Sequence, residues 1–278
     1  MIRDITIGQY YDTNSPIHRL DPRTKIIGTF AYIVGLFLVK SIFGFVLAAA
    51  LLFAVIRISK IPLSFILRGQ KSIAMLLVLT IILNMFMIKG DPLVSFGFLT
   101  ISRQGLYTAI FMAVRLVLLV IGCSLMTLTT TPLSLTDGLE HLMRPLKVLK
   151  VPVHDIAMMM SIALRFIPIL LEETDKIMKA QSARGADFET GSLVQRTKAL
   201  IPVLVPLFVS AFRRADELAT AMEARCYRGD EGRTQMKQLH YTKMDILALM
   251  LIVLSVVALY LSRYLPSVST VAGYLWQW

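Results

Sequence analysis

Long apolar blocks dominate both ends of the chain. They cover Ile26–Val39, Ile42–Ile56, Ser72–Ile88, Leu106–Thr130 and Ile246–Leu261. The first two are separated only by Lys40 and Ser41, which favours a tight helical hairpin. A helix needs about 20 predominantly apolar residues to cross a bilayer. The pattern therefore predicts an all-α, multi-pass membrane protein with about five transmembrane helices.

The stretch from 131 to 243 alternates between apolar and charged segments instead. Thr131 and Pro132 are a suitable N-cap and first helical residue, and Val151-Pro152 ends the short amphipathic helix that they begin. Two longer segments follow, with apolar trunks at Ile156–Leu171 and Ala199–Phe212. The trunks are short for spans and contain prolines, so we expect them to lie obliquely at the inner membrane interface.

Each trunk continues into a charged tip, and the two tips repeat at an offset of 41 residues. Asp175 aligns with Asp216, Ala180 with Ala221, Ala183 with Ala224, and Arg184 with Arg225. Segments rich in Gly and polar residues follow both tips, as is typical of helix ends. The sequence thus predicts two helical arms, built on one plan, that extend from the membrane into the cytosol as amphipathic coupling helices.

Three domains follow from this layout: a membrane domain at 1–130, a cytoplasmic-side coupling domain at 131–243, and a last span with an outer tail at 244–278. Basic residues set the orientation, because cytoplasmic loops carry an excess of Lys and Arg. A cytoplasmic N-terminus puts on the inner side Arg3, Arg19, Arg23, Lys25, Arg57, Lys60, Arg68 and Lys71, together with the long basic stretch. It leaves on the outer side Lys40, Lys89, Arg103 and Arg263, with an aromatic belt at Tyr274, Trp276 and Trp278.

Composition supports a membrane location. The chain of 278 residues is 56% hydrophobic and only 17% charged, whereas soluble domains carry about 25% charged residues. The net charge of +11 would suggest nucleic acid in a soluble protein, but here it follows from the basic inner loops, so we expect no nucleic-acid partner. The first 25 residues are polar and predict no cleavable signal peptide.

No catalytic or nucleotide-binding motif is visible. The sequence contains no GxxxxGK[ST], HExxH, GxSxG or CxxC pattern, so we expect neither a cofactor nor a metal, and Cys123 and Cys226 predict no disulfide. The histidines at 18 and 154 favour interfacial or capping roles. Arg115 and Asn84 lie inside apolar blocks, where polar groups are functional candidates, but a structural pairing is the favoured interpretation of both.

Arg184 and Arg225 are the strongest candidates for a functional role. Either one alone is explained by its favourable position at a helix C-terminus. Two of them at matching ends of repeated arms, each preceded by Ala, favour a pair of plugs that enter paired sockets. A guanidinium suits such a socket because its rigid fork makes bidentate hydrogen bonds.

Four segments together make the chain resemble the shared transmembrane component, EcfT, of energy-coupling factor (ECF) vitamin importers. They are SPIHRLDPRTK (Ser15–Lys25), TPLSLTDGLEHLMRPLK (Thr131–Lys147), ALRFIPILLEETDKIMKAQSARG (Ala163–Gly185) and AMEARCYRG (Ala221–Gly229). The family pattern has two X-Arg-X motifs, often Ala-Arg-Gly. They stand here as Ala183-Arg184-Gly185 and Ala224-Arg225-Cys226, where Cys226 replaces the more common glycine.

The resemblance implies a non-catalytic coupling subunit in the cell membrane. Its partners would be two ABC ATPases, which hydrolyse the ATP, and a small membrane-embedded subunit that binds the vitamin. Arg184 and Arg225 would each enter a groove of one ATPase, and the arms would cradle the substrate-binding subunit. Met158, Met159 and Met160 suit such a contact because methionine repacks against different partners, although an ordinary membrane-facing role explains each of them equally well.

Two other classes remain as alternatives. An intramembrane enzyme would need a polar cluster facing a cavity, for which the spans offer little beyond Arg115 and Asn84. An autonomous ABC-type permease would dimerise and carry one coupling helix per chain, whereas this chain has two arms.

Overall fold

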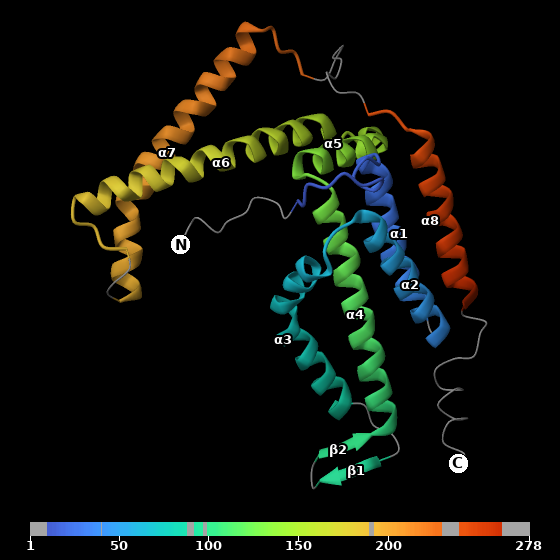
Figure 1. Ribbon diagram of the computed structural model, residues 1–278. Helices are drawn as coiled ribbons and strands as arrows, with labels where there is room; N and C mark the ends of the chain where they lie inside the picture. The colour runs from blue at the N-terminus through green and yellow to red at the C-terminus, as the bar shows by residue number, and fades with distance from the viewer. Residues whose placement is uncertain are drawn as a thin grey trace. The chain divides into compact units, whose positions relative to one another are not determined.

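A computed structural model describes residues 10–39, 41–87, 92–96, 99–188, 192–229 and 239–262. The α-helices are α1 (Pro22–Leu38), α2 (Ile42–Ser59), α3 (Leu63–Met87), α4 (Arg103–Thr129), α5 (Pro132–Met143), α6 (Val153–Ala183), α7 (Leu193–Ala224) and α8 (Lys243–Leu261), and they are shown in Figure 1. A 3₁₀ helix, η2 (Arg144–Leu149), follows α5. Two short antiparallel strands, β1 (Pro92–Phe96) and β2 (Leu99–Ser102), join α3 to α4.

The chain divides into two compact units, with the boundary inside α5. The membrane unit comprises the described residues of 10–138 and 239–262, and the arm unit comprises the described residues of 139–229. Outside the described residues lie several features of the predicted topology: Arg3, Lys40, Lys89, Arg263 and the aromatic residues Tyr274, Trp276 and Trp278. Parts of the polar segments after both arms also lie outside them.

The predicted class, a helical multi-pass membrane protein, is confirmed. A helix occupies each of the five apolar blocks, and the arms are helical as expected. Among the residues that the structure describes, four helices are long and apolar enough to cross a membrane, namely α2, α4, α6 and α8. This set differs from the predicted five. It includes α6, which is one continuous helix that is long and apolar enough to cross a membrane. It excludes α1, which has only 17 residues, and α3, whose apolar segment is only Ile73–Met87. The small β1–β2 hairpin was not predicted.

Close packing joins the first and last helices of the membrane unit. Gly28 and Gly35, one face of α1, approach Ile252 and Leu259 of α8 so closely that an added Cβ would lie 2.9 and 3.0 Å from their side chains. Small residues allow this approach between membrane helices. The steps of seven residues run the same way on both helices, so α1 and α8 are parallel.

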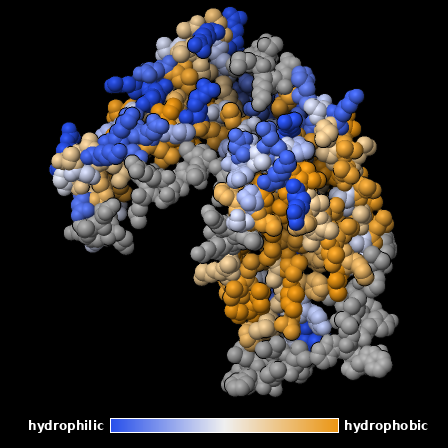
Figure 2. Space-filling model, viewed as in Figure 1, coloured by the Kyte–Doolittle hydropathy of each residue, from blue (hydrophilic) through white to orange (hydrophobic). Residues whose placement is uncertain are grey.

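The surface of the membrane unit is apolar. Figure 2 shows hydrophobic side chains over most of its visible face. Large apolar residues of this unit, such as Phe30, Met75 and Leu254, are exposed. An exposed apolar surface of this extent requires lipid or a partner to cover it.

A buried polar cluster joins three helix ends of the membrane unit. The Asp245 side chain is fully buried at the start of α8, and its carboxylate accepts hydrogen bonds from the Asp21 backbone N–H at 2.8 Å and from the Thr242 backbone N–H and hydroxyl at 2.8 and 2.6 Å. Arg23 pairs with Asp21 at 2.8 Å. Lys25 donates to the carbonyl oxygen of Thr129, the last residue of α4, at 2.8 Å. The start of α1, the end of α4 and the start of α8 therefore share one side of the bundle.

The segment that leads into α1 is fixed by its own hydrogen bonds. Ser15 and His18 are hydrogen-bonded at 2.6 Å, and the other ring nitrogen of His18 lies 3.0 Å from the Tyr11 carbonyl oxygen. Burial lowers the pKa of His18, while the bond to the Tyr11 carbonyl opposes this shift. These contacts give Ser15 and His18 a structural role at the start of the Ser15–Lys25 segment.

Arg115 has the structural pairing expected from the sequence. Its Nη2 donates to the carbonyl oxygen of Val39 at 2.9 Å, and its guanidinium lies 5.4 Å from the ring centroid of Phe45. Asn84 was expected from the sequence to hydrogen-bond another helix, but its amide N–H donates to the Thr80 carbonyl within α3 at 2.8 Å. This bond satisfies one N–H of the amide without a second helix.

Candidate functional site

The two arms are continuous helices of 31 and 32 residues, α6 and α7. Each contains the predicted apolar trunk and charged tip, and the helices continue through Pro168, Pro202 and Pro206. They pack against each other within the arm unit, and Figure 1 shows them crossing. Each predicted trunk therefore forms one continuous helix with its tip, and the two helices cross.

At the crossing the helices run in opposite directions. Arg214 Nη2 donates to Glu173 Oε2 at 2.7 Å. Closer to the C-terminus of α6, the side-chain amide of Gln181 donates to the carbonyl oxygen of Pro202 at 3.4 Å, and Pro202 lies closer to the N-terminus of α7. The sequence repeat did not reveal this sense of crossing. Its consequence is that the two tips lie at opposite ends of the helix pair.

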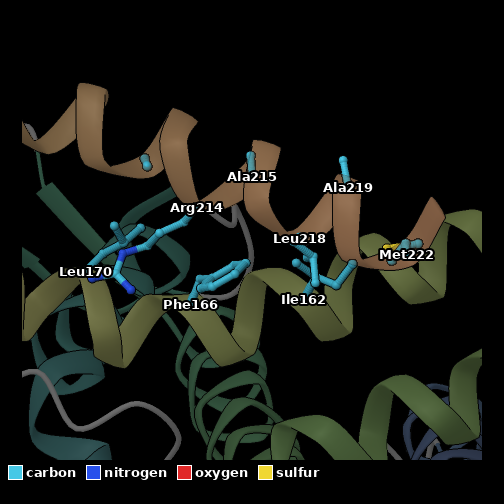
Figure 3. Close-up of a pocket in the computed structure, with 9 residues that line it drawn as sticks. Ile162, Phe166, Leu170, Arg214, Ala215, Leu218, Ala219 and Met222 are labelled. Carbon is cyan, nitrogen blue, oxygen red and sulfur yellow. The ribbon is translucent and has the colours of Figure 1, made fainter. Parts of the chain in front are cut away.

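An apolar groove separates the helices on one side of the ion pair, as Figure 3 shows. The α6 residues that line the groove recur every four positions, and those of α7 recur every three or four positions. Each set therefore lies on one face of its helix. The lining residues are Ile162, Phe166, Leu170, Ala211, Arg214, Ala215, Leu218, Ala219 and Met222. Alanines make up much of the α7 wall, so the contact there leaves space between the helices.

The Glu173–Arg214 ion pair joins equivalent positions of the repeat. The two residues are 41 apart, which is the offset that aligns the arm tips. Two oppositely directed helices whose central contact joins equivalent residues have the arrangement of a local two-fold axis. Arg184 and Arg225 each lie 11 residues beyond this pair, about 16 Å along their helices. The two arginines are thus equivalent positions at the two ends.

Both helices end in the same hydrogen-bonded cap. At the end of α6 the Ala186 N–H donates to the Gln181 carbonyl and the Gly185 N–H to the Ser182 carbonyl, both at 3.0 Å. Gly185 has a φ of +90°, and Arg184 is the C-cap residue. This is the Schellman pattern, in which a left-handed residue reverses the chain.

The α7 end repeats this cap with cysteine in the left-handed position. The Tyr227 N–H donates to the Met222 carbonyl at 3.1 Å and the Cys226 N–H to the Glu223 carbonyl at 2.9 Å, with Cys226 at a φ of +55°. Arg225 therefore occupies the same place as Arg184. A residue with a Cβ is strained in this conformation by about 1 kcal/mol, so Cys226 retains the geometry at a cost that Gly185 avoids.

The difference between the caps predicts that mutations at the two left-handed positions change stability in opposite directions. Cys226→Gly should stabilise the α7 cap, and Gly185→Ala should destabilise the α6 cap, each by about 0.5 to 1 kcal/mol. An added Cβ at Gly185 meets no atom within 4 Å, so its cost arises from the backbone alone. Hydrogen exchange of the Tyr227 and Ala186 amides would measure both changes. Exchange that slows in Gly185→Ala would contradict this assignment of the caps.

All six residues of the two X-Arg-X motifs are exposed, which leaves both guanidinium groups accessible. They are Ala183, Arg184, Gly185, Ala224, Arg225 and Cys226. The small residues beside each arginine let another backbone approach closely. The methionine run lies in the first turns of α6, where Met158 is half-buried and Met159 and Met160 are exposed.

Comparison with known proteins assigns the chain to a family. The model of a family described as cobalt transport protein (CbiQ) matches residues 13–236. The energy-coupling factor transporter transmembrane protein EcfT of Ruminiclostridium cellulolyticum is 59% identical over 247 residues, which cover 89% of this chain and 92% of the relative. The chain belongs to the EcfT family. The resemblance inferred from four sequence segments is therefore confirmed.

Other EcfT proteins extend the match over nearly the whole chain. The one from Thermosediminibacter oceani is 53% identical over 264 residues, covering 95% of this chain and all of the relative. The one from Bacillus subtilis is 48% identical over 246 residues, covering 88% of this chain and 93% of the relative. The chain is thus the transmembrane component of an ECF transporter and lies in the membrane.

Two features of the geometry were not predicted from the sequence, the Glu173–Arg214 ion pair of the arms and the buried Asp245 of the membrane unit. The Glu173–Arg214 ion pair carried a signal, because its members are separated by the repeat offset. Asp245 carried another, since Thr242 and Asp245 have the spacing of a capping box at the start of the last apolar block. Neither pattern shows that Glu173 contacts Arg214 or that Asp245 contacts Asp21, and only the fold shows these contacts.

Proposed function

We propose that this chain is the non-catalytic coupling subunit of an ATP-driven importer. It links two ABC ATPases, which hydrolyse the ATP, to a small membrane-embedded subunit that binds the vitamin. Arg184 and Arg225 each dock into one ATPase, together with their neighbours Ala183, Gly185, Ala224 and Cys226. The N-terminus is cytoplasmic, and the chain is organised as a membrane domain at 1–130, a coupling domain at 131–243 and a last span with an outer tail at 244–278.

The observation that carries the proposal is the equivalence of the two arm ends. Arg184 and Arg225 occupy the same position in the same cap, equally far from the Glu173–Arg214 pair that joins the two helices. A pair of related ATPases presents two equivalent surfaces across an axis, and such a pair is matched by two equivalent plugs related in the same way. One docking helix per chain would require a second copy for the same match.

The coupling movement follows from the crossed helices. When ATP closes the two ATPases, their sockets approach and carry the two arm ends with them. Because α6 and α7 contact at Glu173–Arg214 and leave a groove beside it, the crossing acts as the pivot. The ends move relative to each other, and the trunks tilt in response.

The substrate-binding subunit contacts the trunk of α6 in this account. Met159 and Met160 are exposed there and Met158 is half-buried. Flexible thioether side chains can repack as the trunk tilts. Tilting changes the surface offered to the subunit, which releases or reorients it.

Subunit stoichiometry tests this function against its alternatives. The tagged chain is purified from its native membrane in mild detergent, and every co-purifying protein is identified and counted. One chain with two ATPase subunits and one small membrane protein is the expected composition. Two copies of the chain with two ATPases would indicate an autonomous permease, and recovery of the chain alone would favour an intramembrane enzyme.

A further inference from the structure

The linker between α5 and α6 carries an exposed surface that the coupling function leaves unexplained. The 3₁₀ helix η2 has the sequence RPLKVL and is followed by Lys150. All seven residues from Arg144 to Lys150 are exposed. Val148 and Leu149 are among the most exposed apolar residues described, at 87% and 71%. Apolar side chains this accessible need an apolar environment to cover them.

The 3₁₀ geometry sorts these residues by chemistry. With three residues per turn, positions i and i+3 lie one above the other. Arg144 and Lys147 therefore form one basic row along η2, and Lys150 follows at the same spacing. Leu146 and Leu149 form a second row, and Pro145 and Val148 a third. The 3₁₀ geometry thus places the basic side chains in one row and the apolar side chains in the other two.

The charge of this surface has one sign. No acidic residue occurs between Glu140 and Asp155. In the sequence the segment begins 15 residues after Thr129, the last residue of α4, which is apolar enough to span the membrane. Exposed apolar rows beside a basic row are the pattern of an element that lies in a membrane interface and binds anionic headgroups.

We propose that Arg144–Lys150 docks on the membrane surface as an anionic-lipid anchor. Val148 and Leu149 enter the boundary between headgroups and acyl chains, and the basic row contacts lipid phosphates. The anchor holds the root of α6 at the interface, so the arm tilts about a fixed point. This site needs no ATPase or substrate-binding subunit, and its test is independent of the coupling function.

Tryptophan quenching in lipid nanodiscs tests the anchor with the full chain alone. Val148→Trp is introduced into a background of Trp276→Phe and Trp278→Phe, which replaces both native tryptophans. The discs contain phosphatidylcholine with brominated acyl chains, either alone or with an equal part of phosphatidylglycerol. We expect strong quenching with phosphatidylglycerol, weaker quenching without it, and loss of the difference at high salt. Thr220→Trp, at an exposed position on α7, should not be quenched.

Lys150→Gly removes a charge without disturbing the turn. Lys150 has a φ of +59°, a conformation that glycine adopts freely. In phosphatidylglycerol discs this change should lower the ratio of docked to undocked tryptophan in the Val148→Trp chain about fivefold. Lys60→Gly is the matched control, because Lys60 has a φ of +58° at the end of α2, and it should leave the ratio unchanged.

Three results would overturn the lipid anchor. If the tryptophan of Val148→Trp stays unquenched in phosphatidylglycerol discs, water or a protein partner covers the surface. Equal quenching in both lipids, unaffected by Lys150→Gly, would mean apolar contact without recognition of charge. An equal effect of Lys60→Gly would assign the response to the net charge of the chain.

Discussion

Replacing Arg184 and Arg225 together with alanine is expected to abolish ATP-driven uptake while leaving the protein in the membrane. Both residues are exposed at helix ends, so truncation removes no internal packing. An arginine that anchors an interface contributes about 2 kcal/mol or more, which is about a 30-fold loss of affinity for each ATPase. Uptake by whole cells and retention of the ATPases on the tagged chain would measure the loss.

The single variants and one control make this result specific. Arg184→Ala and Arg225→Ala should each weaken retention of one ATPase, and Arg184→Lys should restore it poorly, since lysine lacks the rigid fork of arginine. Arg213→Ala changes an exposed arginine on α7 away from the cap and should behave like the unmodified protein. Normal uptake by the double alanine variant would remove both arginines from the coupling mechanism.

Asp245→Ala is expected to be the most destabilising single change in the membrane unit. The carboxylate is fully buried and accepts from the Asp21 N–H and from two donors of Thr242. Alanine would leave the buried Asp21 N–H unsatisfied, at a cost of about 1 to 3 kcal/mol. It would also remove the side chain that completes the capping box with Thr242 at the start of α8, at about 0.5 to 2 kcal/mol. We expect a loss of about 3 kcal/mol or more in the free energy of unfolding, measured by denaturant titration in detergent.

Two companion variants separate the buried carboxylate from a general charge effect. Asp245→Asn retains one carbonyl oxygen as an acceptor and should lose less stability than the alanine variant. Asp155→Ala removes an exposed acidic residue from the first turn of α6 and should cost under about 1 kcal/mol. If Asp245→Ala were as mild as Asp155→Ala, the cluster would not hold α1 and α8 together.

Local pattern predicted the elements of this fold well. The apolar blocks marked the positions of α1–α4 and α8, because a membrane helix is defined by the composition of one continuous segment. The 41-residue repeat located both arm tips, and the caps confirm that Arg184 and Arg225 are equivalent. Cys226 kept the left-handed geometry that its position requires, although the sequence has cysteine where glycine is common.

Contacts between distant segments could not be predicted in the same way. A repeat has the same sequence whether its copies pack parallel or antiparallel, so the crossing at Glu173 and Arg214 emerged only from the fold. Asp245 and Asp21 are 224 residues apart, and no local pattern pairs them. The β1–β2 hairpin lies in a short connection between two apolar blocks. The pattern of apolar blocks predicts only the helices and not the structure of the connections between them.

The most direct test of the coupling account is photo-crosslinking from the two arm ends. A photoreactive amino acid replaces Arg184, Arg225 or both in the assembled transporter, and the mass of each adduct is determined. The account predicts that each single position captures one ATPase and that the doubly substituted chain captures two. Capture of a single ATPase by both positions, or of no ATPase by either, would contradict the claim that the two arm ends are paired plugs.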